Sequence, residues 1–143
     1  MNSINRIIVP VNGSEADQQA IDLACQIARK NKSRVEAIYV IEVKRSLPID
    51  AELHGEVERG ESILDAAERL SHEQEIDMET SLFQARDVGA AIVDEAVQLR
   101  ADVIVMGVTY KRKFGEFAMG PTATYVLKNA PCLVWVARQP GTI

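Results

Sequence analysis

Residues 102–138, DVIVMGVTYKRKFGEFAMGPTATYVLKNAPCLVWVAR, hold two apolar runs separated by a basic loop that lies between glycines. The first run, Val103 to Met106, is apolar at every position and stops at Gly107, which is typical of a strand covered on both faces in a parallel sheet. A short helical pattern leads from Gly120 to the second run, Cys132 to Val136. The order strand, loop, helix, strand predicts a βαβ unit with a candidate anion site at the N-terminus of its helix.

The rest of the chain alternates strand and helix patterns in the same way. Apolar runs at 6–11 and 35–41 predict two further buried strands. Apolar and polar residues alternate at 76–82, which predicts a strand with one solvated face and therefore an edge strand. Apolar residues at helical spacing lie between these strands. The alternation predicts an α/β fold, a doubly wound parallel sheet of five strands with helices on both faces, in one domain over residues 1–143.

The residues after the first predicted strand carry turn and helix-start signals. Asn12-Gly13-Ser14 is a strong turn signal, and Pro10 marks where the chain leaves the sheet, since a proline in mid-strand would remove a ladder donor. Ser14, with Asp17 three residues later, predicts a helix start similar to a capping box. Asp87 is expected to cap the helix that follows the third strand.

The glycine spacing of the C-terminal unit resembles the signature of the universal stress protein family, which reads Gly-x2-Gly-x9-Gly-Ser/Thr in its nucleotide-binding members. Laid on this sequence, the outer glycines are Gly107 and Gly120, the middle glycine falls on Tyr110, and the Ser/Thr falls on Pro121. The resemblance extends to IIVPVNGSEAD at residues 7–17, to the chain length and to the order of elements. It implies a Rossmann-like sheet in the strand order 3-2-1-4-5, which suits the edge character of the third strand.

In that strand order the winding reverses between the first and fourth strands, and ligands of open α/β sheets bind in the crevice at such a point. The resemblance implies that ATP or AMP binds there, with Mg²⁺ present only when a nucleotide is bound. The expected contact residues come from the strand ends, the loops and the start of the last helix: Pro10, Val11, Asn12, Val40, Arg86, Met106, Gly107, Tyr110, Lys111, Arg112, Gly120, Pro121 and Thr122.

Several of these positions have specific expected roles. Gly107 and Gly120 allow the backbone to approach a ligand closely, while Lys111, Arg112 and Lys113 supply positive charge. Arg86 is expected to add a fork-like donor if its loop folds over the crevice. The alternative interpretation is that the glycines only make turns and that the cations only keep a loop solvated.

The sequence also departs from the nucleotide-binding pattern. The aspartate that contacts adenosine in such relatives is Asn12 here, which keeps an acceptor and loses the charge. Tyr110 places a large ring where the family has a glycine, and this ring is a candidate for stacking on a base. Pro121 removes both a hydroxyl and an amide donor at the phosphate end.

Composition excludes several other function classes. The net charge of −5 argues against nucleic acid as a general partner, because phosphate neutralisation needs a basic face. No apolar run approaches the ~20 residues that span a bilayer, and no leader pattern opens the chain, so we expect a cytoplasmic protein without membrane insertion. Cys25 and Cys132 have no metal or redox spacing, and His54 and His72 fall among charged helix residues, so no metal site is expected. Catalysis is not expected beyond very slow ATP hydrolysis, because no activated nucleophile accompanies the crevice.

Two functions stay open: a nucleotide-responsive stress-response module, and a dimeric regulatory or scaffold protein of the same fold that binds no nucleotide. In either case the fifth strand lies at an edge of the sheet, although it carries Leu133, Val134, Trp135 and Val136. An apolar edge strand with unpaired amides is normally covered or paired. Because members of the family dimerise through this strand, the resemblance implies a homodimer.

Overall fold

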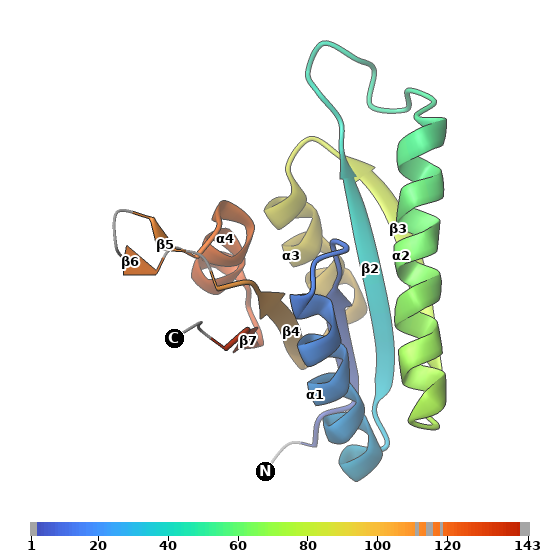
Figure 1. Ribbon diagram of the computed structural model, residues 1–143, viewed down its shortest axis with the longest axis vertical. Coiled ribbons are helices and arrows are strands. Elements are labelled where there is room, and N and C mark those ends of the chain that lie inside the picture. The colour runs from blue at the N-terminus through green and yellow to red at the C-terminus, as the bar shows by residue number, and fades with distance from the viewer. Residues whose placement is uncertain (1–2, 111, 114–115, 118, 141–143) are drawn as a thin grey trace.

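The computed structural model describes residues 3–110, 112–113, 116–117 and 119–140, and these form a parallel sheet with helices on both sides (Figure 1). The sheet strands are β1 (Arg6–Pro10), β2 (Arg34–Glu42), β3 (Met78–Ala85), β4 (Val103–Val108) and β7 (Leu133–Arg138). The helices are α1 (Ala16–Asn31), α2 (His54–Glu73), α3 (Val88–Leu99) and α4 (Pro121–Asn129). Two short strands, β5 (Arg112–Lys113) and β6 (Glu116–Phe117), form a separate antiparallel pair between β4 and α4.

The order of strands across the main sheet is β3-β2-β1-β4-β7, and every pair of neighbours is parallel. The predicted fold class and strand order are therefore confirmed, with β3 at one edge and β7 at the other. The winding reverses between β1 and β4, which are paired through Ile7 with Val103 and Ile8 with Ile104. That junction is the switch point at which a ligand crevice is expected.

Each face of the sheet has its own hydrophobic core, because successive strand residues point to opposite faces. Ile7 and Val9 of β1 face α1 and α2, whereas Ile8 between them faces α3 and α4. The continuous apolar runs in the sequence follow from this double covering. Figure 1 shows α1 and α3 on opposite sides of the sheet.

Helix α1 lies close to the sheet because its buried stripe consists largely of alanines, among them Ala16, Ala20 and Ala24. The closest approach is at Gly107, where an added Cβ would lie 2.1 Å from the carbonyl oxygen of Ala16. Strand β4 continues through Gly107 to Val108, so the expectation that the strand stops at this glycine is wrong. The glycine is needed for the approach of α1 and does not end the strand.

The boundaries of β3 and β7 also differ from the sequence patterns. Pairing with β2 extends β3 to Ala85, beyond the alternating stretch at 76–82. Pairing with β4 carries β7 to Arg138, although the apolar run ends at Val136. In both cases backbone pairing with a neighbouring strand sets the end of the element, and this pairing leaves no local signal in the sequence. Asp87 does cap α3 as predicted, with its carboxylate accepting a hydrogen bond from the Ala90 amide at 2.9 Å.

Helix α2 packs over β2 and β3, and Gly60 sits at the contact. A Cβ at Gly60 would lie 2.7 Å from the ring of Tyr39, so this glycine allows the helix to approach the sheet. With 20 residues α2 is the longest helix, and it carries charged side chains along its length. Within the described ranges, no helix combines the length and the hydropathy needed to cross a membrane.

The substitution Gly107→Ala should lower the free energy of unfolding by ~1–3 kcal/mol, the usual cost of overpacking, because the new methyl group meets backbone rather than a movable side chain. Urea denaturation monitored by circular dichroism measures the change. The matched control is Gly55→Ala in α2, where no atom of the described residues lies within 4 Å of an added Cβ. This control should gain up to ~1 kcal/mol from the higher helix propensity of alanine. Equal stabilities of Gly107→Ala and the wild type would contradict the close-approach argument.

Candidate functional site

A crevice of about 360 Å³ opens at the carboxyl ends of β1 and β4, where the winding of the sheet reverses. Its volume falls within the range of small-ligand pockets, ~300–1,000 Å³. It is lined by strand ends and by the first turns of α1, α3 and α4, through Pro10, Val11, Asn12, Ser14, Asp17, Ile38, Tyr39, Val40, Val88, Ile92, Met106, Gly107, Val108, Thr109, Gly120, Pro121, Thr122 and Ala123. Segments far apart in sequence therefore meet at one place.

Most residues expected at the site do line this crevice. They are Pro10, Val11, Asn12, Val40, Met106, Gly107, Gly120, Pro121 and Thr122. Four expected residues are not among the described lining residues. Lys111 lies outside the described residues, and of Arg112 the structure describes only the backbone, as part of β5. Arg86 and Tyr110 are described and lie elsewhere.

Arg86 does not face the crevice. Its side chain stabilises the loop between β2 and α2. Its guanidinium donates hydrogen bonds to the carbonyl oxygens of Lys44, at 2.5 Å, and Leu47, at 2.8 Å. Gln84, two residues earlier, donates a hydrogen bond to the carbonyl oxygen of Ile49 at 3.0 Å. The side chains of Gln84 and Arg86 therefore both hydrogen-bond to this loop. Arg86 was expected to add a fork-like donor if its loop folded over the crevice, but its Nη1 donates to backbone carbonyls of that loop and Arg86 is not among the described lining residues.

Tyr110 packs against the end of β7. The guanidinium carbon of Arg138 lies 4.8 Å from the centre of the Tyr110 ring, which is the geometry of a cation–π contact. This pairing places the ring beside the end of the edge strand, and Tyr110 is absent from the described crevice lining. The expected stacking of Tyr110 on a base therefore has no support in the geometry. The sequence could not reveal this, because residues 110 and 138 are distant along the chain.

The turn after β1 is organised by Asp17, which the sequence analysis treated only as part of a helix cap. The Asp17 carboxylate accepts hydrogen bonds from the amides of Gly13, at 2.8 Å, and Asn12, at 3.2 Å. The hydrogen bond between Asp17 and Ser14 runs from the Asp17 backbone amide to the Ser14 carbonyl oxygen and involves neither side chain. The predicted capping box is therefore wrong. Burial raises the pKa of the Asp17 carboxyl above its ordinary value, while the two amide hydrogen bonds act to lower it.

Asn12 stabilises the same turn with its side-chain oxygen, which accepts a hydrogen bond from the Ser14 amide at 2.9 Å. This is the oxygen that the sequence analysis counted as the remaining acceptor for a ligand. Gly13 takes a φ of 87°, a conformation that favours glycine. The carbonyl of Ile38 also accepts a hydrogen bond from the Val11 amide at 2.9 Å, which ties this segment to β2. The wall formed by residues 11–17 is therefore fixed by its own hydrogen bonds.

The opposite end of the crevice is the N-terminus of α4. Pro121 is the first residue of the helix, a position whose amide would have no intrahelical acceptor, so the proline is well tolerated there. The amides of Thr122 and Ala123 fall in the same unpaired first turn, and both residues line the crevice. Among the described residues, no atom lies within 4 Å of a Cβ added at Gly120. This end offers hydrogen-bond donors and the positive end of a short helix dipole.

The described lining is mainly apolar between these two polar ends. Ile38, Val88 and Ile92 were missed by the sequence analysis, although Ile38 lies two residues before Val40 and so shares its face of the strand. Thr109 was missed because β4 is longer than its apolar run. Among the described lining residues, the carboxylate of Asp17 is the one charged group. The crevice therefore suits a ligand with an apolar body and a polar or anionic end.

Comparison with known proteins gives two sequence matches over nearly the whole chain. A family model described as the Universal stress protein family matches residues 3–138. The universal stress protein MJ0531 of Methanocaldococcus jannaschii is 30% identical over 145 residues, covering 97% of this chain and 85% of that protein.

Three solved structures share the fold. A universal stress protein from Archaeoglobus fulgidus matches with a TM-score of 0.81 at 19% identity, over 92% of this chain and 97% of that one. A structure of the universal stress protein from the same organism in complex with dAMP has a TM-score of 0.75 at 18% identity, over 94% and 98% of the two chains. A universal stress protein family protein from Arabidopsis thaliana with AMP bound has a TM-score of 0.69 at 19% identity, over 96% and 93%.

Replacing Arg86 by methionine should release the loop between β2 and α2 while leaving the crevice lining intact. Losing charged hydrogen bonds worth ~1.5–3 kcal/mol should speed amide hydrogen exchange in residues 44–51 about tenfold or more. Exchange measured by mass spectrometry tests this. Arg45→Met, at an exposed position in the same loop, is the matched control and should leave the rates unchanged. Unaltered exchange in the Arg86 variant would show that these hydrogen bonds do not hold the loop.

Proposed function

Because the chain belongs to the universal stress protein family, we propose that it is a stress-response regulatory module whose crevice binds an adenine nucleotide, AMP or ATP. The observation that carries the proposal is the position of the crevice at the β1–β4 switch point, with an apolar centre and a helix N-terminus at one end. We place the module in the cytoplasm, where adenine nucleotides are abundant metabolites.

The three parts of a nucleotide have matching surroundings in this crevice. Ile38, Val40 and Met106 offer apolar contacts to a base. Ser14 and Thr109 supply hydroxyl groups within the lining that suit ribose hydroxyls. The amides of Thr122 and Ala123, with the Thr122 hydroxyl, suit a phosphate at the start of α4. The complexes of the A. fulgidus protein with dAMP and of the A. thaliana protein with AMP support this choice of ligand class.

The proposed role is regulatory binding, with at most very slow ATP hydrolysis. No histidine or cysteine is among the described lining residues, so Ser14 and Thr122 have no adjacent base of the kind that activates a nucleophile. The Asp17 carboxylate already accepts hydrogen bonds from two turn amides. Mg²⁺ would therefore be held mainly through the phosphates of ATP and would accompany the nucleotide.

A second function, as a dimeric regulatory or scaffold protein, is favoured by the β7 edge. β7 pairs with β4 on one side, and Leu133 and Trp135 remain 56% and 37% exposed. A second copy of the chain is the proposed partner, because the same edge strand on two subunits can pair about a two-fold axis. This dimer is compatible with an occupied crevice, since the two sites use different residues.

Calorimetric titration with AMP and with ATP tests the nucleotide proposal. Joint replacement of Lys111, Arg112 and Lys113 by glutamine should weaken ATP binding about tenfold or more and weaken AMP binding less, since ATP carries more negative charge. The matched control replaces Lys30, Lys32 and Lys44, exposed cations outside the described crevice lining, and should leave both affinities nearly unchanged. Absence of heat at millimolar nucleotide in the wild type would favour the scaffold function.

The dimer is tested at Leu133, because Val134 packs against the core and its replacement would also affect folding. Leu133→Lys places a charge on each side of the proposed two-fold interface and should shift the mass measured by light scattering from dimer to monomer. Leu127→Lys on α4, where the leucine is 45% exposed, is the matched control and should stay dimeric. A wild-type chain that is monomeric at tens of micromolar would refute the interface.

A further inference from the structure

The two ends of the crevice have opposite electrostatic character. At the end formed by the turn after β1, the carboxylate of Asp17 is the one charged group among the described lining residues. At the other end, the first-turn amides of Thr122 and Ala123 belong to the positive end of the α4 dipole. The lining between these ends is mainly apolar. A ligand in the crevice therefore meets a negative group at one end and hydrogen-bond donors at the other.

The negative charge of Asp17 is held in place by backbone amides. The carboxylate accepts hydrogen bonds from the amide of Gly13 at 2.8 Å and from the amide of Asn12 at 3.2 Å. Amide donors favour the charged form of a carboxyl group, but they carry no net charge that would cancel it. Within the described part of the chain, no ion pair reaches Asp17. Arg59 lines the groove between α1 and α2 and is absent from the described crevice lining.

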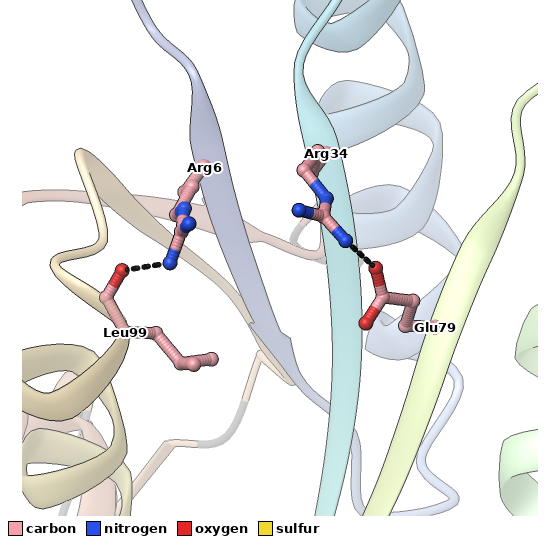
Figure 2. A network of polar contacts seen from close by, with 4 residues as sticks. All are labelled: Arg6, Arg34, Glu79 and Leu99. Atoms are coloured by element: carbon pink, nitrogen blue, oxygen red, sulfur yellow. Dashed lines mark hydrogen bonds and ion pairs between the residues drawn. The ribbon is translucent and has the colours of Figure 1, made fainter.

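An acid at the amino ends of the strands is balanced differently, as Figure 2 shows. There Arg34 forms an ion pair with Glu79 at 2.9 Å. Arg6, on the neighbouring strand, donates a hydrogen bond to the carbonyl oxygen of Leu99 at 2.8 Å. Both arginines and Glu79 line one cavity of about 170 Å³, so positive charge lies beside the acid. The described crevice lining contains no such cation, so the charge of Asp17 stays effective there.

Asp17 lies beside the hydroxyl group that suits the ribose of a nucleotide. The Asp17 amide donates a hydrogen bond to the carbonyl oxygen of Ser14 at 3.1 Å, and both residues line the crevice. A carboxylate offers about four lone-pair positions, so it can accept from a ribose hydroxyl in addition to the two turn amides. A phosphate on that hydroxyl would instead bring two negative charges together, which lowers affinity.

We propose that Asp17 is a specificity-determining residue of the crevice, because its carboxylate excludes anionic groups from the end formed by residues 12–17. The class of ligand that fits is a nucleotide with an unsubstituted ribose and one anionic end, which lies at α4. Nucleotides that carry a further phosphate on the ribose are rejected. The choice of a nucleotide rests on the proposed function, whereas the exclusion of anions rests on the charge of Asp17. The same charge fixes the direction of the ligand, since its phosphate would meet the carboxylate if it were reversed.

Calorimetric titration with AMP and with adenosine 3′,5′-bisphosphate compares a ligand that has one anionic end with a ligand that has two. The wild type should bind AMP ~tenfold or more tightly than the bisphosphate. Asp17→Asn keeps an oxygen that accepts from the turn amides but removes the charge, so it should bring the two affinities within ~threefold of each other. Asp65→Asn, at an exposed position on α2, changes the net charge equally and should keep the wild-type preference. Distortion of the turn would weaken both nucleotides, so the ratio of the two affinities isolates the effect of the charge.

A second measurement needs no nucleotide. Two soluble nitroxide probes, one carrying a carboxylate and the other its uncharged carboxamide, broaden the NMR signals of the amides that they approach. At residues 12–14 of the wild type, the anionic probe should broaden the amide signals at least ~twofold less than the neutral probe, because the carboxylate repels it. Asp17→Asn should remove most of this difference, whereas Asp65→Asn should keep it. The Thr122 amide at the other end of the crevice should show no such deficit of the anionic probe.

Equal affinity of the wild type for the two nucleotides would overturn the proposal, as would a preference for AMP that survives in Asp17→Asn. So would an Asp17 carboxyl carbon with the chemical shift of a protonated acid at neutral pH. If the wild type bound neither nucleotide, the proposed function would fail. The comparison of the two probes would then still decide whether Asp17 keeps anions away from this end of the crevice.

Discussion

The contact between the first turn of α1 and β4 at Gly107 is the constraint on which the site depends. An added Cβ would lie 2.1 Å from the Ala16 carbonyl, so no other residue type fits at position 107 without moving the helix. This approach brings the turn after β1 against the end of β4, the two segments between which the crevice opens. The turn after β1 keeps its shape because its backbone amides donate hydrogen bonds to the Asp17 carboxylate. Fold and site therefore share one point of close packing.

The overall fold could be predicted because its causes are local and repeated. Buried parallel strands need apolar residues on both faces, and the helices between them need an apolar stripe, so the alternation is visible in the sequence. The edge position of β3 was visible for the same reason, since its alternating residues left one face to solvent. The ends of β3, β4 and β7 were not visible, because pairing between strands extends each of them past its own pattern.

The site was predicted where it depends on backbone position and missed where it depends on side-chain partners. Strand ends and helix starts must meet at the switch point, so Asn12, Met106 and Thr122 could be placed there in advance. Arg86 and Tyr110 could not, because the carbonyls of Lys44 and Leu47 and the guanidinium of Arg138 are distant in sequence. Asp17 was missed because a carboxylate after a turn has the same local signal whether it caps a helix or binds the turn.

The two walls of the crevice differ in the kind of interaction that they offer a ligand. The wall of β1, α1 and β4 rests on close packing and on amide hydrogen bonds to the Asp17 carboxylate. The wall of β2 and α3 contributes apolar side chains to the lining, among them Ile38, Val88 and Ile92. A ligand lying between these walls would meet polar atoms of the turn on one side and an apolar surface on the other. The ligand's orientation would therefore be set by the polar turn at Asn12, which the close approach at Gly107 holds against the end of β4.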